Sequence, residues 1–148
     1  MKDKYIVYFI SRTKAEMIKF IDNKLKKNNL DVLIPSHGNI LTALFESDRP
    51  LTMKEISKKI GKDKSTVTTL VNKLINLEYL EKEKSTSDKR VTYIKLTENA
   101  RNIEDRFNHI SSQVRETAYS NFTEEEKQEF LRLLKKLSTN FKNANNLD

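Results

Sequence analysis

The sequence predicts a mainly α-helical protein with one short two-stranded β-hairpin. Gly and Pro, which often form turns, occur only twice each among 148 residues, whereas average usage is about 7% and 5%. Apolar residues recur at the three- and four-residue spacing of amphipathic helices along most of the chain. The segment 91–94 is instead rich in β-branched and aromatic residues, as strands are. A β-sandwich or barrel would need more turn residues than this chain has.

Two helices are predicted before residue 50. Residues 3–28 form the first, because apolar side chains recur on one face and lysines cluster near its end. The second covers residues 35–47 and begins with Pro35, which the first turn of a helix tolerates because the missing N–H would be unpaired there anyway.

Two shorter helices follow, joined by a tight turn. Thr52–Glu55 has the pattern of a capping box at the start of the helix predicted for 51–60, and Gly61 suits the left-handed residue that ends it. Asp63 then caps a helix predicted for 64–77. This is a helix-turn-helix pattern.

The second helix of this pair has an outer face of unusual composition. Val67 lies at the centre of its apolar arc, and the opposite arc holds small hydrogen-bonding side chains and Lys without any carboxylate. Hydroxyls and amides read base edges in a DNA major groove, and Lys meets phosphate. A solvated surface helix, the alternative, usually mixes Glu with Lys. We therefore predict a recognition helix with this outer arc: Ser65, Thr68, Thr69, Asn72, Lys73 and Asn76.

A basic hairpin, here called the wing, is predicted next. Its strands cover 79–83 and 91–96, and the polar linker between them ends in Asp88, Lys89 and Arg90. Arg90 and Lys89 suit a narrow minor groove, and Asp88 is expected to pair with Arg90 and orient it. A helix-turn-helix followed by such a hairpin is a winged helix.

Two more helices complete the prediction. The fifth starts at Thr97, and the sixth starts at a second capping box, Thr123–Glu126, with apolar residues spaced for helix pairing. The tail 143–148 is expected to fray.

Charge and composition narrow the function. Residues 49–95 hold 12 basic and 6 acidic side chains and so carry nearly all of the net charge of +7. This excess favours a polyanion partner.

Cys is absent, which excludes disulfides, thiolate zinc sites and a thiol redox sensor. There is no Gly-rich phosphate loop, and we expect no enzyme activity. No apolar stretch suits a membrane span, so a soluble, cytoplasmic and nucleoid-associated protein without membrane contact is expected.

The motifs together resemble those of the MarR family of bacterial winged helix-turn-helix transcription regulators. Leu51–Gly61 followed by Lys64–Thr68 is similar to the family's helix-turn-helix, and Asp88-Lys89-Arg90 followed by Leu96-Thr97-Glu98 is similar to its wing signature. The chain departs from the family pattern at Glu78, where Gly is frequent. A left-handed Glu78 would be strained by about 1 kcal/mol; otherwise the helix ends differently.

The resemblance implies a mainly α, single MarR-like domain, with a winged-helix lobe at 31–96 and helical dimerisation segments at 1–30 and 97–148. It also implies a homodimer that binds a pseudo-palindromic double-stranded DNA operator, usually as a repressor, often under control of a small aromatic effector. The residues alone do not distinguish repression from activation. We assign DNA contact to ten residues: Lys64, Ser65, Thr66, Thr68, Thr69, Asn72, Lys73, Asp88, Lys89 and Arg90.

Some residues allow more than one interpretation. His37 is a candidate ligand contact near the family's effector cleft, although a helix-capping role is the simpler interpretation. His109 lies near several carboxylates, but two His without Cys are few for zinc, and we expect no metal and no cofactor. Tyr5, Tyr8 and Phe9 suit a dimer core better than a ligand pocket. Two alternative functions remain, a winged-helix protein-interaction module and a non-specific nucleoid-binding protein.

Overall fold

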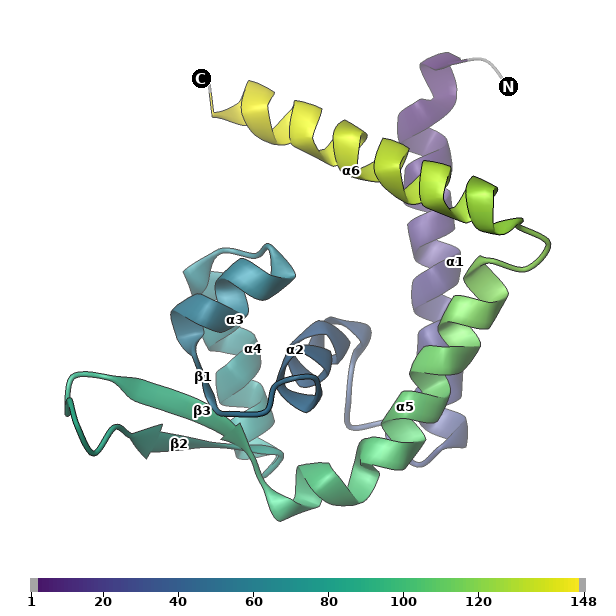
Figure 1. The fold of residues 1–148 in the computed structure, drawn as a ribbon. Helices are drawn as coiled ribbons and strands as arrows, with labels where there is room; N and C mark the ends of the chain where they lie inside the picture. Colours follow the sequence, from purple (N-terminus) through teal and green to yellow (C-terminus); the bar gives the residue numbers. More distant parts are fainter. Residues whose placement is uncertain (1–2, 147–148) are drawn as a thin grey trace. The chain divides into compact units, whose positions relative to one another are not determined.

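The computed structural model describes residues 3–146 and is mainly helical, as predicted (Figure 1). None of the helices within residues 3–146 is long and apolar enough to cross a membrane. The elements in chain order are η1 (Asp3–Tyr5), α1 (Ile6–Lys27), α2 (Pro35–Phe45), β1 (Leu51–Thr52), α3 (Met53–Ile60), α4 (Lys64–Asn76), β2 (Leu80–Lys84), β3 (Thr92–Leu96), α5 (Glu98–Ala118) and α6 (Glu124–Asn145).

The described residues form two compact units divided after Ser111, within α5. In the first unit, α2, α3 and α4 pack together against one face of a small sheet (Figure 1). Arg106 on α5 also donates to the Asn28 carbonyl at the end of α1 (2.9 Å). The core is apolar, as amphipathic patterning requires. Its most buried side chains are Leu30, Ile40, Leu41, Ile56, Val67, Val71, Leu74, Leu80, Ile94 and Ala100.

The sheet has three antiparallel strands in the order β1-β3-β2, whereas the sequence predicted only the two strands of the wing. In β1, Leu51 pairs with Ile94 and Thr52 pairs with Tyr93. Thr52 also caps α3, so the strand passes directly into the helix. A strand of two residues has no periodicity to detect, and only its pairing with β3 defines it.

Helix α4 ends in the left-handed turn that the sequence left open. Glu78 has φ 62°; its N–H donates to the Ile75 carbonyl (2.9 Å), and the Tyr79 N–H donates to the Leu74 carbonyl (3.0 Å). These two bonds define a Schellman motif, whose left-handed position favours Gly because a Cβ is strained there. Glu78 therefore adopts a conformation that costs it energy.

Replacing Glu78 with Gly should stabilise the protein. The substitution removes the left-handed penalty and should raise the free energy of unfolding by about 1 kcal/mol. The converse change, Gly61→Ala at φ 66°, should lower it by a similar amount. Urea denaturation of both variants measures the effect, and an unchanged midpoint for Glu78→Gly would show that the turn is not strained.

Several element ends differ from the prediction by one or two residues. Helix α2 ends at Phe45 and α4 at Asn76, and both wing strands begin one residue later than expected. The expected fraying was wrong for residues 143–145, because α6 continues to Asn145; residues 147–148 lie outside the described part. The second capping box is confirmed, since the Thr123 side chain accepts from the Glu126 N–H (3.1 Å).

Candidate nucleic-acid interface

The turn between α3 and α4 is fixed by Ser57. Its carbonyl accepts from the N–H groups of Gly61 (3.0 Å) and Lys62 (3.3 Å), and its hydroxyl donates to the Lys62 carbonyl. Gly61 is left-handed, as predicted. Ser57 thus closes the turn by hydrogen bonding, in addition to being small enough for two helices to approach.

Asp63 caps α4 and restrains Thr66. Its carboxylate accepts from the Thr66 N–H (3.1 Å) and from the Thr66 hydroxyl (2.5 Å). These bonds hold the pKa of Asp63 below its usual value, so the cap stays ionised. The hydroxyl of Thr66 therefore already donates its hydrogen bond within the protein, and the residue lies in the first turn of α4.

The outer arc of α4 faces solvent as the helical wheel predicted. Thr69 is exposed and Thr68 is half-buried, and their hydroxyls donate back to the carbonyls of Ser65 (3.1 Å) and Lys64 (2.8 Å). Each threonine therefore offers outward an oxygen acceptor and a methyl group rather than a free O–H donor. Exposed Ser, Asn and Lys side chains supply donors on the same helix: Lys64, Ser65, Asn72, Lys73 and Asn76.

The wing loop confirms the predicted pairing of Asp88 with Arg90. Arg90 donates from Nε to one carboxylate oxygen (3.1 Å) and from Nη2 to the other (3.2 Å), and its N–H donates to the first oxygen (3.1 Å). These hydrogen bonds lower the pKa of Asp88. The Arg90 side chain is 90% exposed, and Lys89 beside it is also exposed. The pair presents a preoriented guanidinium to solvent.

A group of lysines on α3 and the turn was not singled out from the sequence. Lys54, Lys58 and Lys62 are exposed, and in the part of the chain that the structure describes no carboxylate lies within ion-pair distance of them. Their four-residue spacing could have revealed them, because positions i and i+4 share a helix face. The first helix of a helix-turn-helix crosses the DNA backbone, so these lysines extend the candidate interface.

Comparison with known proteins agrees with this geometry. The model of the MarR family matches residues 33–91, which include α2, α3, α4 and the wing loop. The transcriptional regulator SarZ of Staphylococcus aureus is 28% identical over 111 residues, 75% of this chain and 72% of SarZ. SarZ of Staphylococcus haemolyticus is 26% identical and covers 95% of this chain and 94% of its own length. By these matches the chain is similar to the MarR family of transcription regulators, and residues 33–91 carry the match to the family model.

Solved structures extend the match to almost the whole chain. A MarR protein from Peptoclostridium difficile superposes with a TM-score of 0.77 at 26% identity, covering 97% of this chain and 92% of that protein. MepR of Staphylococcus aureus, solved in complex with DNA, has a TM-score of 0.77 at 23% identity over 95% of this chain and 98% of MepR. These relatives are transcription regulators rather than enzymes.

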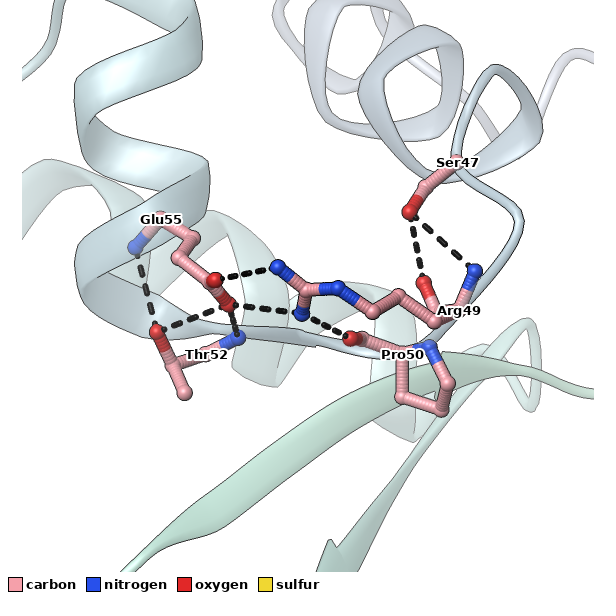
Figure 2. A network of polar contacts seen from close by, with 5 residues as sticks. All are labelled: Ser47, Arg49, Pro50, Thr52 and Glu55. Carbon is pink, nitrogen blue, oxygen red and sulfur yellow. Dashed lines mark hydrogen bonds and ion pairs between the residues drawn. The ribbon is translucent and has the colours of Figure 1, made fainter.

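Arg49 is a second group that the sequence did not reveal (Figure 2). Its guanidinium donates to both Glu55 oxygens (2.6 and 3.3 Å) and to the Pro50 carbonyl (3.0 Å). Glu55 also accepts from the Thr52 N–H (2.8 Å), and together these bonds lower its pKa to about 2. The loop before β1 is thereby fastened to the first turn of α3, which steadies the first helix of the helix-turn-helix.

His37 lies at the start of α2 and caps it. The side chain is buried, and its Nδ1 accepts the Ile34 N–H (3.2 Å), so Nδ1 carries no proton. Burial, and secondarily the charge of Lys73 on α4, lowers the pKa of His37 below its ordinary value of 6.5. The capping interpretation is confirmed, and the proposed ligand contact stays a prediction.

Acidification should destabilise the protein through His37. Its folded-state pKa is below the unfolded value, so the unfolded chain binds the proton more readily. Stability should be complete above about pH 6.5 and fall as the pH drops below it. His37→Gln, which keeps an acceptor at the same capping position, should flatten this dependence between pH 7.5 and about 5.5 in urea titrations. His109→Gln, at an exposed site, should leave it unchanged, and equal slopes in all three proteins would contradict the assignment.

Two open hollows lie on the part of the molecule that the structure describes. Within residues 3–146, no cluster of three or more His, Cys, Asp or Glu is arranged to hold a metal ion. One hollow of about 330 Å³ is lined by residues of α2 and α3, including Asn39 and Lys59. Another, of about 500 Å³, lies beside Arg49 and Tyr93. His37 lines neither of them.

Proposed function

We propose that this chain is a MarR-family regulator, a homodimeric repressor of a pseudo-palindromic operator that is released by a small aromatic effector. The observation that carries the proposal is the exposed, carboxylate-free face of α4, flanked by the exposed lysines of α3 and the turn and by the preoriented Arg90 of the wing. A relative solved with DNA, MepR, supports DNA as the ligand. Two others support effector control, since BpsR of Bordetella bronchiseptica is regulated by 6-hydroxynicotinic acid and PcaV of Streptomyces coelicolor was solved with its natural ligand.

The side chains divide into three roles under this proposal. Polar residues of α4 contact base edges in the major groove, and Thr68 and Thr69 do so through acceptor oxygens and methyl groups. The wing residues Lys89 and Arg90 enter the minor groove, and Asp88 orients the arginine. Thr66 bonds to the capping residue Asp63 through its hydroxyl, and its backbone lies near phosphate. Five lysines bind phosphates, and such contacts carry no sequence information. They are Lys54, Lys58, Lys62, Lys64 and Lys73.

The dimer is inferred from exposed apolar faces outside the winged-helix lobe. At the start of the chain, the six consecutive residues Tyr5–Ile10 are between 42% and 68% exposed, and on α6 Phe130, Leu133 and Leu134 are each at least 45% exposed. Soluble monomers rarely expose apolar patches of this extent. We propose that residues 1–30 and 97–148 cover these faces with a second copy, while residues 31–96 form the DNA-binding lobe. A two-fold dimer then presents two recognition helices to an inverted repeat.

Two single substitutions on α4 should separate base readout from phosphate binding. Thr69→Ala should reduce the preference for the operator over random DNA more than it reduces affinity for random DNA. Lys73→Ala should weaken binding to all sequences and lower the slope of log K against log salt by roughly one unit. Fluorescence anisotropy with both duplexes over a range of salt measures these effects, and identical behaviour of the two variants would place α4 outside the groove.

The same titrations discriminate the alternative functions. A non-specific nucleoid protein would show the steep salt dependence without preferring any sequence. A protein-interaction module would show neither a steep salt slope nor sequence preference with duplex DNA. Specific binding that weakens steeply with salt and also selects sequence supports the regulator proposed here.

A further inference from the structure

Thr97 joins the end of the recognition helix to the start of α5. Its hydroxyl donates to the Glu78 carbonyl (2.6 Å) and accepts from the Ala100 N–H (3.2 Å). Its own N–H donates to the Tyr79 carbonyl (3.1 Å). One residue therefore bonds to the turn that ends α4 and also caps the first turn of α5.

The acceptor of the hydroxyl bond belongs to the strained residue of the α4 terminus. Glu78 holds φ 62° although it has a Cβ, and such conformations persist when the surroundings impose them. The junction is well packed, since Leu80 pairs with Leu96 across the wing strands and the side chains of Leu80 and Ala100 are almost fully buried. The bond itself is exposed, but it lies beside this packed junction.

We propose that Thr97 is a positioning residue that sets the direction of α4 relative to α5. Helix α5 leads from the winged-helix lobe into residues 112–148. In a dimer held through these helices, the direction of α4 relative to α5 determines how far apart the two recognition helices lie. Thr97 thereby selects the half-site separation of the operator. This inference rests on the dimeric operator binding proposed above.

Three substitutions distinguish this role from simple capping of α5. Thr97→Ser keeps both hydroxyl bonds. Thr97→Val keeps the shape and loses both. Thr97→Asp keeps a good capping acceptor for the Ala100 N–H but has no proton to donate to the Glu78 carbonyl. Asn99→Asp, at an exposed site in the same turn, controls for the added charge.

The first measurement is the affinity of the full chain for inverted repeats whose half-sites lie about 9 to 12 base pairs apart, centre to centre. The unsubstituted protein should favour one separation by about tenfold or more over its neighbours. Thr97→Val and Thr97→Asp should reduce this ratio to about threefold or less, whereas Thr97→Ser and Asn99→Asp should keep it. An Asp variant that behaves like the unsubstituted protein, beside an altered Val variant, would show that Thr97 only caps α5.

The second measurement needs no DNA. The sequence has no Cys, so Asn76→Cys provides a single spin-label site at the end of α4. The distribution of distances between the two labels of a dimer should be narrow in the protein that keeps Thr97 and in the Thr97→Ser variant. It should broaden or shift in the Thr97→Val and Thr97→Asp variants. Unchanged distributions in both of these variants would overturn the role of Thr97. If the unsubstituted protein ignored half-site separation, the operator proposal would fail, while the label distances would still decide whether Thr97 positions α4.

Discussion

Ending the chain after Phe122 should abolish specific DNA binding although the winged helix stays intact. The truncation removes α6, whose exposed apolar residues are proposed to meet a second copy. The product should be a monomer or an aggregate, and a monomer offers one recognition helix where the operator requires two. Affinity for the operator should fall by about a thousandfold or more, towards non-specific values. Analytical ultracentrifugation and footprinting measure the two effects together.

A chain ending after Asn143 is the matched control, because it removes only the last residues and keeps the apolar residues of α6 through Phe141. It should remain a dimer and bind normally. If the chain that ends after Phe122 were a soluble monomer and still protected the full operator with native affinity, the dimer proposal would be overturned.

Arg90→Ala should weaken operator binding by about 5- to 150-fold without changing helical content. The guanidinium is bound only to Asp88 in the described residues and is largely exposed, so its removal touches no core contact. Asp88→Ala should have a smaller effect, because it frees the arginine from its preoriented position and also removes a negative charge near phosphate. Competition anisotropy at physiological salt gives the ratios.

Arg101→Ala serves as the control for loss of one positive charge, since Arg101 is on α5 and pairs with Glu104 (3.3 Å). It should change affinity little. If Arg90→Ala and Arg101→Ala had the same small effect, the wing would contribute only general charge and Arg90 would be removed from the proposed site.

The sequence predicted the features of this fold that local chemistry determines. Thr52, Gly61 and Asp63 each occupy the cap that their residue type favours, because capping depends on a few neighbouring backbone groups. The outward arc of α4 followed from helical spacing alone, and the pairing of Asp88 with Arg90 is a contact between residues close together in the chain.

Features that depend on three-dimensional neighbours were missed. Strand β1 is defined by pairing with β3, which lies much later in the chain. The bond from Thr97 to Glu78 also joins residues far apart in sequence. The hydroxyls of Thr68 and Thr69 are not free donors on the helix surface, because a helix offers each a carbonyl four residues earlier, and only the rotamer reveals which partner is taken.

Selection of bound sequences from a random pool of duplex DNA with the full chain tests directly whether the protein recognises a specific operator. We expect one inverted repeat with half-sites about 10 base pairs apart, centre to centre. A pool that stays random after repeated rounds, despite salt-dependent binding, would contradict sequence-specific recognition by α4 and the wing.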